Sequence, residues 1–224
     1  MSIGTIGAYF DERAATWNEQ AEPAGPKHLM IAQLAGVREG SRVLDVGCGT
    51  GIMERAYLEL GAASIVGLDL SEAMLACALD TFANVPDERL RFECRDILDY
   101  ASDEPFDTVV IYNAYPHILD KDALVEATAS LLVPGGRFLV AHGMSRETLN
   151  AHHANVPADV TSDLLPEQEA ALDWQDAFDI DMMADTPFTY FFGGSKRLGR
   201  RTSQLRDFRT SRKRQWRFRA STGL

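Results

Sequence analysis

Short apolar runs alternate with helical patterns along residues 42–194, and this alternation predicts an α/β fold. The runs that predict buried parallel strands span residues 43–46, 64–69, 91–94, 106–112 and 137–141. The helices predicted around them cover residues 27–34, 52–60, 72–79, 121–132 and 166–177. Two alternating runs follow at 178–183 and 189–194, on either side of Pro187, and they predict an antiparallel hairpin.

Local signals mark where several of these elements begin and end. Ser71, Asp120 and Ser145 each precede a helical pattern and are suitable N-cap residues. The Pro-Gly-Gly segment 134–136 predicts a turn before the fifth strand. The segment 166–177 predicts a helix with Trp174 as an apolar anchor.

The N-terminal section predicts a helix over residues 9–17. Phe10, Ala14 and Trp17 lie on one face of it at helical spacing. We expect Phe10 and Trp17 to dock the helix on the sheet.

The segment from Val43 to Gly51 combines a buried strand, a glycine-rich turn and a helix start. Glycines at alternate positions allow a ligand to approach the backbone closely, and the following helix offers unpaired N–H groups. Asp45 adds a carboxylate beside these donors. This pair suits a ligand that carries an ammonium and a carboxylate, and it suits a pyrophosphate less well, because Asp45 would repel it.

This segment, Val-Leu-Asp-Val-Gly-Cys-Gly-Thr-Gly, resembles motif I of the class I S-adenosylmethionine-dependent methyltransferases. The resemblance extends over residues 42–194, including the Leu-Val-Pro-Gly-Gly-Arg-Phe-Leu-Val string at 132–140. It implies a Rossmann-like doubly wound sheet of seven strands in the order 3-2-1-4-5-7-6. The last strand pair would be antiparallel, and helices would cover both faces.

The resemblance also implies which residues bind the cofactor, S-adenosyl-L-methionine. Asp69 ends the second strand, where an acid accepts hydrogen bonds from ribose hydroxyls. Asp96 and the backbone of Ile97 would meet the adenine. The full set of implied cofactor residues is Asp45, Gly47, Cys48, Gly49, Asp69, Leu70, Met74, Asp96, Ile97 and Asn113.

The catalytic residues are harder to predict, because the sulfonium already activates the methyl group and the protein mainly positions the reactants. A base is needed only if the acceptor must lose a proton. His117, on the loop after the fourth strand, is the first candidate base, and His142, after the fifth strand, is the second. The resemblance also implies that Tyr9, Arg13 or Trp17 lies beside the cofactor, an interpretation that is compatible with docking of the helix on the sheet. Tyr9 is a candidate for orienting cofactor or acceptor. Each histidine has the alternative of an ordinary buried side chain.

No metal site is expected. The adjacent residues His152 and His153 would point about 100° apart on a helix, and no Cys or acid completes a zinc-like spacing with His142. His152 and His153 either line a substrate pocket or end a solvated helix.

The acceptor is expected to be a small molecule, because the Asn-Ala-Tyr-Pro segment at 113–116 lacks the N/D-P-P-Y/F order of amino-methylating DNA and protein enzymes. Two alternatives remain open. One is a methyltransferase acting on RNA or protein. The other is a nucleotide-binding module without methyl transfer, such as an NAD(P) dehydrogenase, although G-x-G-x-G differs from the dinucleotide fingerprint G-x-G-x-x-G.

The net charge of −11 is unevenly distributed. The stretch from Lys196 to the end holds eleven Lys and Arg residues and one acid, Asp207, so the body before it is strongly acidic. An acidic body argues against nucleic acid as its partner. The tail at 198–224 is expected to be disordered, with a grip on RNA or an acidic partner as the alternative.

The sequence therefore divides into three parts: a helical cap at 1–40, a cofactor-binding domain at 41–197 and the tail at 198–224. Three cysteines without CxxC spacing favour free thiols in the cytoplasm. No apolar run approaches the roughly 20 residues of a membrane span, and the oligomeric state stays open.

Overall fold

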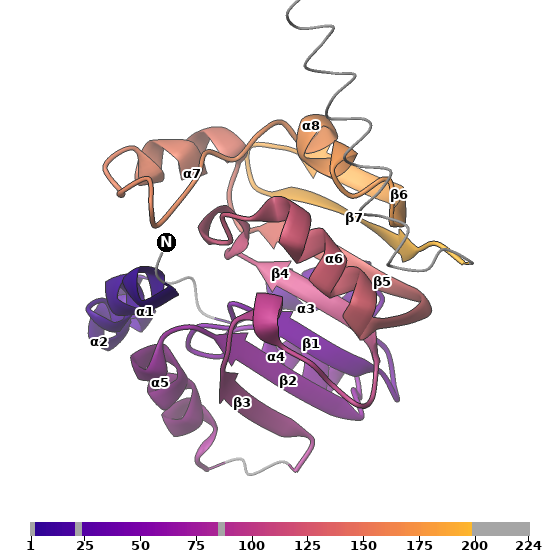
Figure 1. The fold of residues 1–224 in the computed structure, drawn as a ribbon. Coiled ribbons are helices and arrows are strands. Elements are labelled where there is room, and N and C mark those ends of the chain that lie inside the picture. Colours follow the sequence, from indigo (N-terminus) through magenta and orange to yellow (C-terminus); the bar gives the residue numbers. More distant parts are fainter. Residues whose placement is uncertain (1–2, 21–23, 85–87, 199–224) are drawn as a thin grey trace, which may run out of the picture.

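The computed structural model describes residues 3–20, 24–84 and 88–198, so the predicted basic tail lies outside the described residues apart from Leu198. A seven-stranded sheet in the order β3-β2-β1-β4-β5-β7-β6 forms its centre (Figure 1). Its strands are β1 (Arg42–Val46), β2 (Ser64–Asp69), β3 (Leu90–Cys94), β4 (Phe106–Tyr112), β5 (Leu132–His142), β6 (Phe178–Asp185) and β7 (Tyr190–Lys196). Strands β1 to β5 pair in parallel, and β7 is antiparallel to both of its neighbours. The predicted strand order and final antiparallel pair are confirmed.

Helices cover both faces of this sheet. In Figure 1, α6 (Lys121–Leu131) lies in front of the sheet, and α3 (Pro26–Leu34) and α4 (Glu54–Glu59) lie behind it. Side chains alternate between two cores: Val109 and Ile111 of β4 belong to the core that includes α6 and α8 (Glu167–Leu172), and Val110 belongs to the core with α3 and α4. A strand covered in this way needs apolar side chains on both faces, which explains the apolar runs in the sequence.

The remaining helical elements are α1 (Ile3–Asp11), α2 (Ala14–Gln20), α5 (Glu72–Phe82), α7 (Arg146–His153) and the short 3-10 helices η1 (Ile97–Asp99) and η2 (Tyr115–His117). Figure 1 shows α1, α2 and α7 gathered at one end of the sheet. The predicted N-caps Ser71, Asp120 and Ser145 are confirmed, because each side chain accepts a hydrogen bond from a backbone N–H in the first turn of its helix. Among the described residues, no helix is long and apolar enough to cross a membrane.

The single helix predicted over 9–17 is wrong. The chain forms α1 and α2 instead, with a break at residues 12–13. The break follows from a tertiary contact: Asp11 at the end of α1 accepts hydrogen bonds from the Ser71 hydroxyl (2.6 Å) and the Ala73 backbone N–H (3.1 Å) at the start of α5. Phe10 and Trp17 still meet edge to face across the break, 5.7 Å apart.

Two other predicted boundaries are corrected. The helix predicted over 166–177 ends at Leu172, and the chain turns there so that Trp174 stacks on Phe138 in the core, with ring centroids 4.0 Å apart. The turn predicted at 134–136 lies inside β5 as a bulge, where the pairing with β4 jumps from Leu132 to Arg137.

Candidate cofactor-binding and active site

The glycine turn after β1 is shaped by backbone conformations that other residues rarely adopt. Gly47 and Gly49 have φ values of +70° and +57°. The N–H groups of Gly47 and Cys48 both donate to the Leu68 carbonyl, at 2.7 and 3.0 Å, which fastens the turn to β2. A Cβ on Gly47 would lie 2.4 Å from the Cβ of Ala114, whereas a Cβ on Gly49 would meet nothing within 4 Å. The turn therefore presents bare backbone at Gly49.

A cavity of about 430 Å³ opens over this turn, at the carboxyl ends of β1, β2 and β4. This is where open α/β sheets bind ligands. All ten residues predicted to bind the cofactor line it, namely Asp45, Gly47, Cys48, Gly49, Asp69, Leu70, Met74, Asp96, Ile97 and Asn113. The structure thus brings the predicted set together, while their binding role stays a prediction.

Asp69 organises the side of the cavity next to β2. Its carboxylate accepts one hydrogen bond from the Gly49 N–H (2.8 Å) and one from the Ser71 N–H (2.9 Å). Burial raises the pKa of Asp69, although these two hydrogen bonds act in the opposite direction. Each oxygen keeps a further lone pair, so the carboxylate can accept from a ligand hydroxyl while it holds the glycine turn.

Asp45 lies deeper, beside two other acidic groups. Its side chain is 1% exposed, and the fully buried Glu54 and Tyr57 of α4 lie next to it. Burial, above all, raises the pKa of Asp45 to about 7 and moves that of Glu54 upward as well. Asp45 Oδ2 is fully enclosed and has no partner of standard hydrogen-bond geometry among the described residues, although Glu54 and Tyr57 act on the pKa of Asp45 as hydrogen-bond partners. Asp45 also lines the cavity, and a carboxyl group below a bare glycine turn suits a ligand with an ammonium group.

The far end of the cavity has features suited to an adenine ring. The Asp96 side chain caps η1 by accepting from the Leu98 N–H at 2.9 Å, and burial raises its pKa. Ile97 and Met74 line the same cavity and are almost fully buried. An acid and apolar side chains in one cavity fit a flat base that carries an amino group, so the residues present fit S-adenosylmethionine along the whole predicted set.

Asn113 connects the ends of β4 and β5. It is the non-glycine residue with positive φ (+55°) among those described. Its side-chain Oδ1 accepts from the Gly143 N–H at 2.9 Å, and its own N–H donates to the Ala141 carbonyl. A non-glycine residue in this conformation usually marks a functional turn, and this one leads directly into the loop that carries His117.

His117 reaches the cavity from η2 and is held on three sides. Its ring meets Phe10 at 4.9 Å and His153 at 5.0 Å between centroids. Its Nδ1 lies 3.0 Å from the Val160 carbonyl. A carbonyl oxygen can only accept, so Nδ1 carries the proton and, in the neutral ring, Nε2 carries the lone pair. Burial lowers the pKa of His117 to about 4, which keeps the ring neutral near pH 7.

The second candidate base, His142, is not in the cavity. It is fully buried, with its ring 5.9 Å from that of Tyr190, and burial lowers its pKa to about 3. The cause is the period of two along β5: His142 shares a face with Phe138 and Val140 and points into the core. The prediction placed it correctly at the strand end but on the wrong face.

Tyr9 also misses the cavity. Its ring lies under the guanidinium of Arg13 at 3.5 Å, while Ile6 and Phe10 line the cavity. Residues four apart share a helix face, and Tyr9 lies about 100° away from Phe10 around α1. Trp17, one of the alternatives to Tyr9, does line the cavity.

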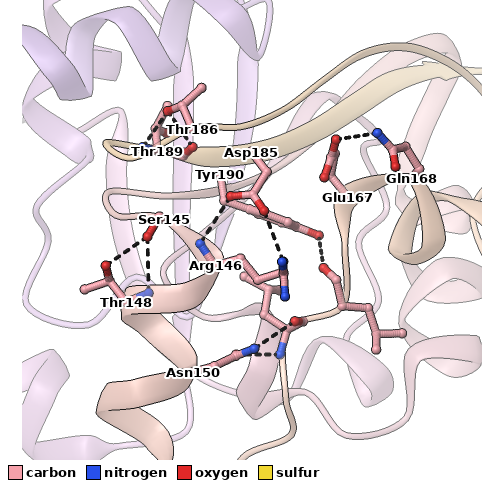
Figure 2. A network of polar contacts seen from close by, with 12 residues as sticks. Ser145, Arg146, Thr148, Asn150, Glu167, Gln168, Asp185, Thr186, Thr189 and Tyr190 are labelled. Carbon is pink, nitrogen blue, oxygen red and sulfur yellow. Dashed lines mark hydrogen bonds and ion pairs between the residues drawn. The ribbon is translucent and has the colours of Figure 1, made fainter.

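The segment 143–165 forms the wall opposite α1. It leaves the sheet after β5 and is anchored at two places (Figure 2). The Arg146 side chain donates to Asp185 at 3.0 Å, and the amide of Asn150 both donates to and accepts from the Leu164 backbone, at 3.0 and 2.9 Å. These anchors are side-chain contacts between distant residues, so the sequence pattern carried no signal for them.

His152 lines the cavity, in agreement with the first of its two interpretations. Other cavity residues were not predicted: Met144 comes from the anchored segment, and Ile118 follows His117. Two hydrogen bonds also tie the N-terminal helices to the cofactor loops: Asp11 with Ser71, and Asn18 accepting from the Thr50 hydroxyl at 2.6 Å. The one sequence signal for the position of these helices was that Phe10 and Trp17 lie on the same helix face, and this face was interpreted mainly as docking the helix on the sheet.

Fold and cavity together define a class of protein: an α/β enzyme that binds a nucleoside with an amino-acid end over a glycine turn. Comparisons with known proteins agree. A family model described as "Methyltransferase domain" matches residues 43–136. The ubiquinone biosynthesis O-methyltransferase of Alkalilimnicola ehrlichii is 32% identical over 180 residues, which cover 75% of this chain and 70% of that protein. The Neisseria meningitidis protein of the same name is 38% identical over 104 residues, covering 43% of this chain and 42% of that one.

A solved structure has the same fold. It is the Haemonchus contortus phosphoethanolamine N-methyltransferase 2 in complex with S-adenosyl-L-methionine, which matches with a TM-score of 0.68 at 23% identity and covers 88% of this chain and 60% of that chain. The chain belongs to the class I S-adenosylmethionine-dependent methyltransferase family. It is an enzyme of small-molecule methyl transfer with S-adenosylmethionine as cofactor, and the alternative of a dinucleotide-binding dehydrogenase is set aside.

Proposed function

We propose that this methyltransferase acts on a hydroxyl oxygen of a small, uncharged, largely apolar acceptor, with His117 as the general base. The observation that supports it most is the composition of the cavity wall. The charged side chains of the lining, namely Asp45, Asp69, Arg95 and Asp96, all come from the cofactor side. The other side is formed by Ile6, Phe10, Trp17, His117, Ile118, Met144 and His152.

Such a wall favours a ring or chain without formal charge. Aromatic and aliphatic side chains stabilise an apolar acceptor by burial and by edge-to-face contacts. Among the described residues of this side, a phosphorylated or quaternary-ammonium acceptor would find no opposite charge. The name of the two curated relatives places methyl transfer on oxygen, in ubiquinone biosynthesis, and this supports oxygen as the acceptor atom here.

The tautomer of His117 supports its role as the base. With Nδ1–H donating to Val160, the lone pair on Nε2 is available to take the proton of an acceptor hydroxyl. The cofactor, when bound, supplies a methyl group on a positively charged sulfur, which is a good leaving group. The residues of this chain then need to hold the hydroxyl in line, take its proton and exclude water, and α1, α2 and segment 143–165 enclose the space for that.

The cofactor side would hold S-adenosylmethionine by backbone and carboxylate groups. The bare backbone at Gly49 and the carboxyl group of Asp45 suit its amino-acid end, Asp69 its ribose and Asp96 its adenine. We treat residues 41–197 as the cofactor-binding domain, with 1–40 as its helical cap. Because Cys48, Cys77 and Cys94 are free thiols, we place the reaction in the cytoplasm.

The test is methyl transfer from labelled S-adenosylmethionine to matched acceptors: a neutral phenol, the corresponding aniline, a phosphorylated phenol and RNA. We expect the neutral phenol to be methylated fastest. His117→Gln should lower kcat by about 10²–10⁴-fold, the range of general base catalysis, and leave S-adenosylhomocysteine affinity unchanged.

His152→Gln is the matched variant, because this imidazole also lines the cavity; it should lose less than about tenfold in kcat. Preferential methylation of the aniline or of RNA would contradict the acceptor class. Full activity in His117→Gln would remove His117 as the base.

A further inference from the structure

A lysine of the next helix holds the loop that carries His117 by hydrogen bonds. Lys121, in the first turn of α6, donates from Nζ to the carbonyl of Tyr115 and, at 2.7 Å, to the carbonyl of Ile118. These two carbonyls lie on either side of His117 in the chain. The ammonium therefore holds the backbone both before and after this residue.

The opposite side of the same loop is held by the segment 143–165. The backbone N–H and the hydroxyl of Ser162 both donate to the Pro116 carbonyl, at 3.0 and 3.2 Å, and the Val160 carbonyl accepts from His117 itself. The imidazole thus lies between a tether from α6 and a tether from the segment. If either tether is lost, the ring can rotate away from Val160 and lose its fixed tautomer.

A buried lysine at this position is expected to lower the stability of the fold, which argues for a specific role. Burial lowers the pKa of Lys121 to about 7, and the ammonium lies 4.1 Å from the centre of the Tyr115 ring. It is also at the N-terminal end of α6, where the helix dipole disfavours a cation. An apolar side chain of similar volume would avoid the costs of burial and of the helix dipole, but it would remove a charged donor from both carbonyls, and the Tyr115 carbonyl would keep only the Ile118 N–H at 3.3 Å.

We infer that Lys121 is a positioning residue for His117: by holding both flanking carbonyls, it keeps the imidazole in the Nδ1–H tautomer with Nε2 toward the acceptor. This inference rests on the proposed function only for its catalytic consequence. The groups that face His117 are Phe10 of α1, His153 of α7 and Lys121 of α6, and Asp173 lies near Lys121. Both His153 and Lys121 act to lower the pKa of His117, after the larger effect of burial.

The experiment compares Lys121→Met and Lys121→Arg with the matched control Lys196→Met. Lys196 is a partly buried lysine of β7 that also donates to a backbone carbonyl, that of Leu132, at 2.6 Å. Nitrogen NMR of histidine-labelled protein with bound S-adenosylhomocysteine reports the tautomer and the titration of His117 without any need for activity. We expect Lys121→Met to lose the single Nδ1–H tautomer and to titrate at higher pH, Lys121→Arg to retain the tautomer, and Lys196→Met to match the wild type.

In kinetics, Lys121→Met should lower kcat by about 10–100-fold, the range for a misplaced catalytic group, with the KM for S-adenosylmethionine within twofold. In the His117→Gln background, adding Lys121→Met should lower kcat by less than about twofold further, because the two residues act as a unit. An unchanged His117 signal in Lys121→Met, or an equal change in Lys196→Met, would overturn the inference. If Lys121→Met does not fold, Lys121→Gln, which can donate to one carbonyl, decides by the same signal.

These outcomes are separate from those of the proposed function. If His117→Gln stays fully active, the base assignment fails, while the NMR comparison still decides whether Lys121 positions the ring. If His117→Gln is inactive and Lys121→Met leaves the His117 signal unchanged, the base assignment stands and the positioning role is wrong.

Discussion

The two sides of the cavity are built in different ways. The cofactor side comes mostly from one stretch, residues 45–97, with Asn113 added from the end of β4, and it presents backbone groups and carboxylates at the ends of β1, β2 and β3. The acceptor side comes from α1, α2, η2 and the segment 143–165, which are far apart in the sequence and meet at one end of the sheet (Figure 1). It presents aromatic, aliphatic and imidazole side chains.

This difference indicates which parts of the enzyme tolerate amino-acid substitutions. A backbone turn at positive φ depends on the absence of side chains, so almost any substitution disturbs it. A wall of side chains can be altered one residue at a time, because the scaffold beneath it is the sheet. The same sheet can therefore hold one cofactor while the acceptor wall is adapted to different molecules.

The largest effect expected on the cofactor side comes from Gly49→Ala, with Gly40→Ala as its matched control. Both glycines have positive φ (+57° and +82°), and at both an added Cβ would meet nothing within 4 Å. Each variant should therefore lose about 1 kcal/mol of stability from backbone strain.

Only Gly49 lines the cavity, so only Gly49→Ala should weaken S-adenosylhomocysteine binding, by more than about 100-fold in calorimetry, because the methyl group takes the space of the ligand. Equal affinities in the two variants would show that this backbone does not contact the cofactor.

A smaller effect is expected on the acceptor side, from Trp17→Ala. Trp17 is 38% exposed and lines the cavity beside Phe10. Its removal should raise the KM for the acceptor about tenfold, the value of one lost aromatic contact, and change S-adenosylhomocysteine affinity less than threefold.

Met30→Ala serves as control, because Met30 is 44% exposed and outside the cavity lining. If Trp17→Ala weakened the cofactor and the acceptor equally, the division into two sides would be wrong at the N-terminal helices.

The smallest effect concerns stability and tests the acidic character of the cofactor side. Asp45 has a folded-state pKa of about 7, above its ordinary value of 3.8. Between these values the folded chain binds more protons than the unfolded chain, so the free energy of unfolding falls as pH rises, by at most about 1.4 kcal/mol per pH unit for one group.

Asp45→Asn stays neutral and should flatten this decline between about pH 4 and pH 7, the interval between the unfolded-state and folded-state pKa values, measured by urea unfolding without cofactor. The exposed Asp99→Asn should leave the slope as it is in the wild type. A steeper or unchanged slope in Asp45→Asn would contradict the burial of this carboxyl as the cause.

The sequence predicted the structure well where an element depends only on neighbouring residues. Strands β2 and β4 have the predicted bounds, because the apolar runs that form them are buried on both faces. Ser71 caps α5 as predicted, since an N-cap depends only on neighbouring residues. The helix predicted over 9–17 failed because Asp11 makes its contacts in α5, and no local pattern reveals a contact with Ser71.

The candidate site divides in the same way. The sequence by itself determined the glycine turn, the acid at the end of β2 and the acid after β3, because each depends on residues close together in the chain, and the strand order followed from the resemblance to the methyltransferase family. Only the tertiary structure decided that His117 faces the cavity while His142 lies in the core, and that Phe10 and Trp17 line the cavity while Tyr9 does not. The physical reason is that a one-residue step turns a side chain to the opposite face of a strand, or by about 100° around a helix. What then lies on that face depends on segments that are distant in sequence.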